Sequence, residues 1–121
     1  MIYTGIDLVE IDRIKRSIKN PRFLSRVFSP QELKFFAQRS FNPSTIAANF
    51  CAKEAFAKAL GTGIRGFSLN EISVLRDRMG APYILLTGKA RELIIARGLK
   101  LSISVSHTKN YATAVLVAYK C

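Results

Sequence analysis

The chain has 121 residues, of which 49% are hydrophobic and 22% are charged. This length and balance predict one folded domain and exclude an intrinsically disordered chain. No apolar run reaches the roughly 18 residues that a membrane span needs. Asp7 and Glu10 lie where a signal peptide would be apolar. We therefore expect a single domain over residues 1–121, located in the cytoplasm and without membrane contact.

The net charge of +11 comes from 19 Lys and Arg residues against 8 Asp and Glu residues. An excess of this size indicates a polyanionic partner, which could be a nucleic acid, an anionic lipid, a phosphorylated ligand or an acidic protein. The charge is concentrated, because six basic residues and no acidic one lie between Arg13 and Arg26. The two cysteines are too few for a zinc site, and Cys51 is interpreted as a buried thiol.

The first two elements follow from hydrophobic spacing. Residues 2–9 alternate, with Ile2, Thr4, Ile6 and Leu8 on one face, and predict a strand that is apolar enough to be central. The isoleucines at positions 11, 14 and 18 then recur at helical spacing and predict a helix with its basic residues pointing away from them.

The next helices are predicted from their ends. In FSPQEL, Ser29 is the expected N-cap, Pro30 takes the first helical position and Glu32 completes a capping box. A third helix is expected from near residue 42 to Leu60, with Gly61 as its C-cap.

The second half of the chain alternates strands and one helix. Strands are expected over residues 68–77 and 82–86, a helix from residue 87 to Gly98, and two closing strands over residues 99–107 and 111–119. This order predicts an α+β fold with antiparallel pairing in the second half, packed around the apolar third helix.

The segment CAKEAFAKALGTG, residues 51–63, places charge inside this apolar helix. On a helical wheel, Glu54 and Lys58 share a face, as do Asn49 and Lys53. Glu54 and Lys58 could form an ordinary surface ion pair, worth only a few tenths of a kcal/mol. They could instead line a ligand site, because the glycines that follow let the backbone approach a ligand closely.

Asp7 and His107 allow two interpretations each. Asp7 could cap the following helix. If it meets Glu54 instead, the two carboxylates need a cation, for which oxygen ligands and nearby basic residues favour magnesium carrying phosphates. His107 could be an isolated surface histidine, or it could form a phosphate-binding strand end with Ser106 and Thr108.

Three motifs, TGIDLVEIDRI, CAKEAFAKALGTGI and SISVSHT, occur in this order and at these separations. Together they resemble the holo-acyl-carrier-protein synthases, a family of small phosphopantetheinyl transferases, over essentially the whole chain. The resemblance implies that the phosphopantetheinyl-transferase fold moves the 4'-phosphopantetheine arm of coenzyme A to a serine of apo acyl carrier protein. Adenosine 3',5'-bisphosphate is released, magnesium is required, and the product supports fatty acid biosynthesis.

The resemblance also implies roles for individual residues. Asp7 and Glu54 match the metal ligands, and Glu54 is the candidate base for the carrier serine. Lys58 matches the lysine that faces the pyrophosphate. The expected coenzyme A pocket comprises Lys53, Lys58, Gly61, Gly63, Ser106, His107 and Thr108. Many members have a basic residue where this chain has Asn49, so a phosphate contact from that position is in doubt.

The family further implies a homotrimer with sites between subunits, and a basic first helix that receives the acidic carrier protein. A trimer would also cover the alanine side of the third helix, which looks too apolar to face water. The expected docking residues are Arg13, Arg22 and Arg26.

A small basic nucleic-acid-binding domain is the alternative function. That alternative predicts base-stacking aromatic residues among the basic ones and no use for Asp7 or Glu54. The basic stretch contains one aromatic residue, Phe23, which favours the enzyme.

Overall fold

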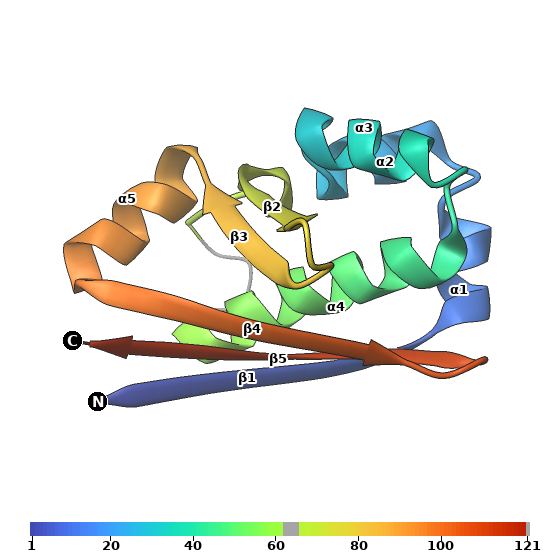
Figure 1. The fold of residues 1–121 in the computed structure, drawn as a ribbon. Coiled ribbons are helices and arrows are strands. Elements are labelled where there is room, and N and C mark those ends of the chain that lie inside the picture. The colour runs from blue at the N-terminus through green and yellow to red at the C-terminus, as the bar shows by residue number, and fades with distance from the viewer. Residues whose placement is uncertain (62–65, 121) are drawn as a thin grey trace.

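The protein is described here by a computed structural model covering residues 1–61 and 66–120. A three-stranded antiparallel sheet has the order β1 (Ile2–Glu10), β5 (Tyr111–Lys120), β4 (Leu99–His107). A separate antiparallel hairpin consists of β2 (Ile72–Arg76) and β3 (Pro82–Leu86). The long helix α4 (Pro43–Leu60) lies between the three-stranded sheet on one side and the hairpin on the other (Figure 1). The predicted α+β architecture around an apolar helix is confirmed.

The remaining helices flank this core. They are α1 (Ile11–Ser17), α2 (Pro21–Val27), α3 (Pro30–Gln38) and α5 (Gly88–Arg97), and a short 3-10 turn, Leu69–Glu71, precedes β2. Helices α2 and α3 lie on the hairpin side of α4, and the two chain ends lie together at one end of the sheet (Figure 1). Within the described residues, no helix is long and apolar enough to cross a bilayer.

Helix α4 begins and ends as its sequence predicts. The Asn42 side chain accepts a hydrogen bond from the Ser44 amide, Pro43 takes the first helical position, and Gly61 ends the helix in the left-handed conformation with φ of 75°. From Ile46 to Leu60 every residue is buried except Glu54, which is half-buried, and Lys58, which is exposed. The helix therefore presents only these two residues of its last four turns to solvent.

The alanine side of α4 packs on the protein's own sheet. A Cβ placed on Gly5 of β1 would lie 1.9 Å from the Ala55 carbonyl oxygen and 2.7 Å from the Ala59 nitrogen. Only glycine permits a backbone approach this close. The expectation that a partner subunit covers the alanine side is wrong, because the sheet already does so.

Three sequence expectations need correction. The helix that begins at Ile11 ends at Ser17, and a further helix, α2, begins at Pro21 because Asn20 caps it and proline favours the first helical position. The strand expected from residue 68 begins only at Ile72, because a Ser68–Glu71 capping box turns the preceding residues into a 3-10 helix.

Strand β1 is the third correction, since it lies at the sheet edge and not at its centre. Its apolar residues Ile2, Ile6 and Leu8 are 70%, 64% and 65% exposed on the outer face of the sheet. The inner face carries Gly5, because only that alternation lets α4 approach the strand.

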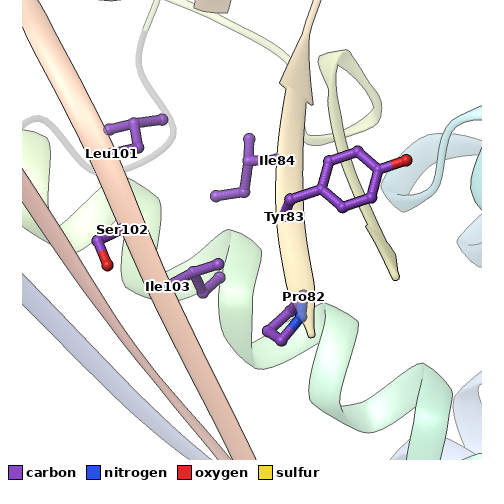
Figure 2. A pocket seen from close by; sticks show the side chains of 6 residues that line it. All are labelled: Pro82, Tyr83, Ile84, Leu101, Ser102 and Ile103. Carbon is purple, nitrogen blue, oxygen red and sulfur yellow. The ribbon is translucent and has the colours of Figure 1, made fainter. Parts of the chain in front are cut away.

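A groove of about 280 Å³ lies between β3 and β4. Ile84 and Ile103 point toward each other across it, whereas the Tyr83 ring points away (Figure 2). Its other lining residues, Pro82, Leu101 and Ser102, add no carboxylate, amine or imidazole. The groove therefore offers no acid, base or charged group for catalysis.

Candidate active site

The half-buried Glu54 and the exposed Lys58 of α4 lie against β1 at the edge of the sheet. Lys58 Nζ lies 3.2 Å from Asp7 Oδ1 and donates a hydrogen bond to the Ile6 carbonyl oxygen at 3.0 Å. An ordinary pair between Glu54 and Lys58 was one expectation, but among the described residues the ion-pair partner of Lys58 is Asp7. The strand and the helix thus bring Asp7, Glu54 and Lys58 into one cluster.

The two carboxylates of this cluster repel each other electrostatically. Burial raises the pKa of Glu54, and the negative charge of Asp7 raises it further. The positive charges of Lys58 and Arg13 lower the pKa of Glu54. Two carboxylates that repel each other in a half-buried setting favour the binding of a cation.

The backbone of β1 holds Asp7 in place. Thr113 of the neighbouring strand donates a hydrogen bond to the Asp7 carbonyl oxygen at 2.7 Å. The alternative that Asp7 caps the next helix is wrong, because the N-cap of α1 is Glu10 and no side chain caps that end.

Cys51 lies against this cluster as an inert thiol. It is fully buried, and its Sγ donates to the Ala112 carbonyl oxygen at 3.4 Å. Burial, together with the nearby charge of Asp7, raises the pKa of Cys51 to about 12. The thiol is therefore protonated at neutral pH, as expected for a structural cysteine.

The two carboxylates define the donor set that a metal could use. Among the described residues, no group of three or more His, Cys, Asp and Glu side chains gathers around one point. Two carboxylates match the hard oxygen ligands of magnesium, which usually keeps several waters and completes its shell with substrate phosphates. The residues present fit a magnesium ion shared with a phosphorylated substrate.

Lys53 lies apart from the cluster of Asp7, Glu54 and Lys58. Its side chain is fully buried on the hairpin side of α4, where Nζ pairs with Glu32 Oε1 at 2.5 Å. Nζ also donates to the carbonyl oxygens of Leu69, at 3.0 Å, and Ile72. In this chain Lys53 therefore contacts protein groups.

The expected SHT residues are not beside the two carboxylates. Asp7 pairs with Ala114 of β5, and Ala114 pairs with Val105 of β4, so His107 is at least two strand spacings, about 10 Å, from Asp7. Ser106 and Thr108 are exposed at the same end of β4. Within one chain these residues and the Asp7 cluster belong to separate regions.

His107 lines a second cavity, of about 220 Å³, beside the first turn of α4. Sequence reasoning missed its two arginines, Arg39 and Arg76, whose guanidinium carbons lie 4.8 and 5.5 Å from the Phe35 ring centroid. Arg76 also donates to Asn49 Oδ1 at 2.9 Å. A guanidinium from β2 thus reaches Asn49 on α4, although no spacing in the sequence indicates this.

The remaining predicted residues lie at the surface or outside the described residues. Gly61 is the exposed C-cap of α4, and Gly63 falls in the segment that is not described. Arg13, on α1, and Arg22 and Arg26, on α2, are all exposed. The Arg13 guanidinium lies 5.9 Å from the Phe50 ring centroid.

Comparison with known proteins agrees with this fold. A family model described as the 4'-phosphopantetheinyl transferase superfamily matches residues 3–116. The chain therefore belongs to the 4'-phosphopantetheinyl transferase superfamily.

The individual relatives that resemble this chain are holo-[acyl-carrier-protein] synthases. The chain is 46% identical to a holo-[acyl-carrier-protein] synthase of Clostridium botulinum over 114 residues, 93% of each chain. The crystal structure of the holo-[acyl-carrier-protein] synthase of Neisseria meningitidis is similar with a TM-score of 0.92 and 36% identity, covering 99% of this chain and 100% of that one. The enzyme of Helicobacter pylori in complex with coenzyme A has a TM-score of 0.83 and 36% identity, covering 98% of this chain and 100% of that one.

Proposed function

We infer that this protein transfers the 4'-phosphopantetheine arm of coenzyme A to a serine of apo acyl carrier protein. The products are holo carrier protein and adenosine 3',5'-bisphosphate, and the reaction supports fatty acid biosynthesis. The observation that carries this inference is the convergence of Asp7, Glu54 and Lys58 at the edge of β1 in a chain of this superfamily.

We propose that Asp7 and Glu54 hold a magnesium ion and that Lys58 faces the pyrophosphate. When bound, the ion would neutralise phosphate charge as the phosphoanhydride is attacked. Lys58 is well placed for this role, because its exposed amine ends at the same cluster as the two acids. The Lys58 side chain is 56% exposed, so its ammonium group can turn from Asp7 to a phosphate.

Glu54 is the proposed general base. The carrier serine hydroxyl attacks the phosphorus that bears the pantetheine arm, and a new oxygen–phosphorus bond forms. The bond from that phosphorus to the oxygen of adenosine 3',5'-bisphosphate breaks, and Glu54 accepts the hydroxyl proton directly or through a water.

A homotrimer would supply the rest of the coenzyme A pocket. The Asp7 cluster and the SHT residues Ser106, His107 and Thr108 lie apart within one chain, so a neighbouring subunit could bring one set to the other. The outer face of the sheet supports such an assembly, because Ile2, Ile6 and Leu8 expose apolar side chains there together with Val115. We propose that this face is the subunit interface.

The trimer can be tested with Ile6→Lys and Leu8→Lys, using Met79→Lys as a control because Met79 is exposed on the hairpin turn. The two strand variants should dissociate and lose coenzyme A binding, and the control should remain trimeric and bind normally. Light scattering and calorimetry measure these outcomes. A fully active monomer at micromolar concentration would contradict the assembly.

The basic surface of α1 and α2 is the proposed docking site for the carrier protein. Arg22→Glu and Arg26→Glu should raise the Michaelis constant for carrier protein and leave that for coenzyme A nearly unchanged. Arg91→Glu, on the exposed face of α5, is the matched control. Arg13 is a less specific probe, because its charge also lowers the pKa of Glu54. Equal effects on both constants would contradict docking at this surface.

The function itself is tested by incubating the protein with coenzyme A, magnesium and apo acyl carrier protein, then measuring the mass of the carrier. Glu54→Gln and Asp7→Asn should both fold and lose most activity, and raised magnesium should rescue Asp7→Asn better. Turnover of Glu54→Gln within a few-fold of the parent would contradict the metal-site proposal. No mass gain together with tight oligonucleotide binding would favour the nucleic-acid alternative.

The structure gives that alternative no added support. Phe23, the one aromatic residue in the basic stretch, is half-buried. Its ring centroid lies 6.0 Å from the ring centroids of both Phe28 and Phe50. It is therefore engaged in packing and poorly available for base stacking. A single domain over residues 1–121 and a cytoplasmic location stay predictions from the sequence.

A further inference from the structure

A buried polar network lies on the side of α4 opposite the sheet. The carboxylate of Glu32 accepts hydrogen bonds from the backbone amides of Ser29 and Val74, at 3.1 and 3.3 Å, and from the Asn49 side chain at 2.9 Å. It also pairs with Lys53. The network therefore ties the start of α3, the middle of α4 and strand β2 together.

Lys53 extends this network to the segment that enters β2. Its ammonium group donates to the carbonyl oxygens of Leu69, the first residue of the 3-10 turn, and of Ile72, the residue that follows the turn. Asn49, one turn earlier on α4, donates to the Val74 carbonyl oxygen at 2.8 Å. Two successive turns of α4 are thus anchored to backbone groups of one neighbouring segment.

This arrangement fixes α4 from both sides. On the sheet side, Gly5 brings β1 into backbone contact with Ala55 and Ala59. On the hairpin side, Lys53 and Asn49 prevent the helix from sliding or turning, because either motion would break several buried hydrogen bonds. Glu54 follows Lys53 directly in the chain, so its position relative to Asp7 depends on both sets of contacts.

We propose that Lys53 is a positioning residue that sets the place of Glu54 through its buried bonds to Glu32, Leu69 and Ile72. This inference rests on the proposed function of Glu54 and Asp7. It assigns Lys53 a role that differs from a coenzyme A contact, because its side chain is fully buried and its ammonium group is held by Glu32, Leu69 and Ile72.

The buried charges make the choice of variant important. Removing one member of a buried pair leaves the other charge uncompensated and is strongly destabilising, whereas replacing both members can be nearly neutral. Lys53→Met keeps the length and apolar stem of the side chain. The double variant Lys53→Met with Glu32→Gln also removes the remaining charge, and glutamine can still accept the Ser29 amide in the capping box.

Three measurements separate the possible roles of Lys53. We expect both variants, assayed well below their unfolding temperatures, to lose at least about tenfold in kcat, since a displacement of about 1 Å can cost about a hundredfold. The Michaelis constant for coenzyme A should stay within about twofold of the parent. The variants change no group that binds coenzyme A equally in the ground state and in the transition state. Calorimetric affinity for magnesium alone should fall several-fold, because the two acids lose their relative placement.

Ile94→Ala on α5 is the control for lost stability. Ile94 is buried and makes none of the hydrogen bonds of the network, so this variant should unfold at lower temperature with kcat and magnesium affinity unchanged. A raised Michaelis constant for coenzyme A with normal kcat would overturn the proposal in favour of substrate contact. Normal kcat in the double variant would overturn it in favour of a purely structural pair. Absent magnesium binding in the parent protein would instead refute the proposed metal site, while the effect on kcat still tests Lys53.

Discussion

Replacing Gly5 with alanine should separate β1 from α4 and so disturb the stability and the active site together. The added Cβ would lie 1.9 Å from the Ala55 carbonyl oxygen and 2.8 Å from the Ala55 carbonyl carbon, whereas Cβ contacts below 3.0 Å essentially never occur. Both atoms belong to the helix backbone, which cannot swing aside as a side chain can. The strand must therefore move off the helix by about 1 Å.

Overpacking of a core interface typically costs about 1–3 kcal/mol, and a contact between two backbones should fall at the upper end, near about 3 kcal/mol. For a chain of this length, about 3 kcal/mol corresponds to a decrease in melting temperature of roughly 10–15 °C. Because Asp7 lies two residues along the same face of β1, it moves with the strand. A displacement of about 1 Å predicts a loss of up to about a hundredfold in turnover.

Thermal unfolding and phosphopantetheine transfer, measured well below the melting temperature, test this prediction. Met79→Ala is the control, since Met79 is exposed on the hairpin turn. It should change neither the melting temperature nor the turnover appreciably. A Gly5→Ala protein that melts within about 2 °C of the parent and turns over within a few-fold would refute the close-packing argument.

Three further predictions concern individual groups. In carbon-detected NMR without metal, Asp7→Asn should lower the titration midpoint of Glu54 and Arg13→Gln should raise it, because these charges raise and lower its pKa respectively. Unmoved midpoints would contradict that coupling. Cys51, with its pKa raised to about 12, should resist iodoacetamide at pH 8 until the protein unfolds, as mass spectrometry of its peptide would show. Ser29→Ala should lower the free energy of unfolding by about 1–2 kcal/mol, seen as a lower urea midpoint, because the Glu32 amide loses its cap. An unchanged midpoint would mean that the cap is dispensable.

Much of the local structure could be predicted from residues close together in the sequence. The capping box of Ser29 and Glu32 and the C-cap Gly61 depend on bonds within a few residues, and the structure has all three as predicted. The break between α1 and α2 also has a local cause, Pro21 after a capping Asn20, but the spacing of the isoleucines concealed it. The hydrophobic repeat alone therefore overestimated the first helix.

The sequence also determined which chemistry is available, since it contains only one histidine and few acids, and two of those acids stand in distinctive motifs. It could not determine which groups meet. Lys58 pairs with Asp7, 51 positions away, whereas the spacing of four residues had suggested Glu54. Lys53 turns inward to Glu32, although its neighbour Glu54 reaches the surface.

Only the tertiary structure decided these partners, because both sides of α4 are covered and each polar side chain must find its partner in whatever packs there. A buried ammonium group cannot remain without hydrogen-bond acceptors, so Lys53 takes the carbonyl oxygens that the β2 segment supplies. The orientation of β1 was decided in the same way. Its apolar alternation fits either face of the sheet, and the close approach of Gly5 to α4 turns Ile2, Ile6 and Leu8 outward and Asp7 toward Glu54.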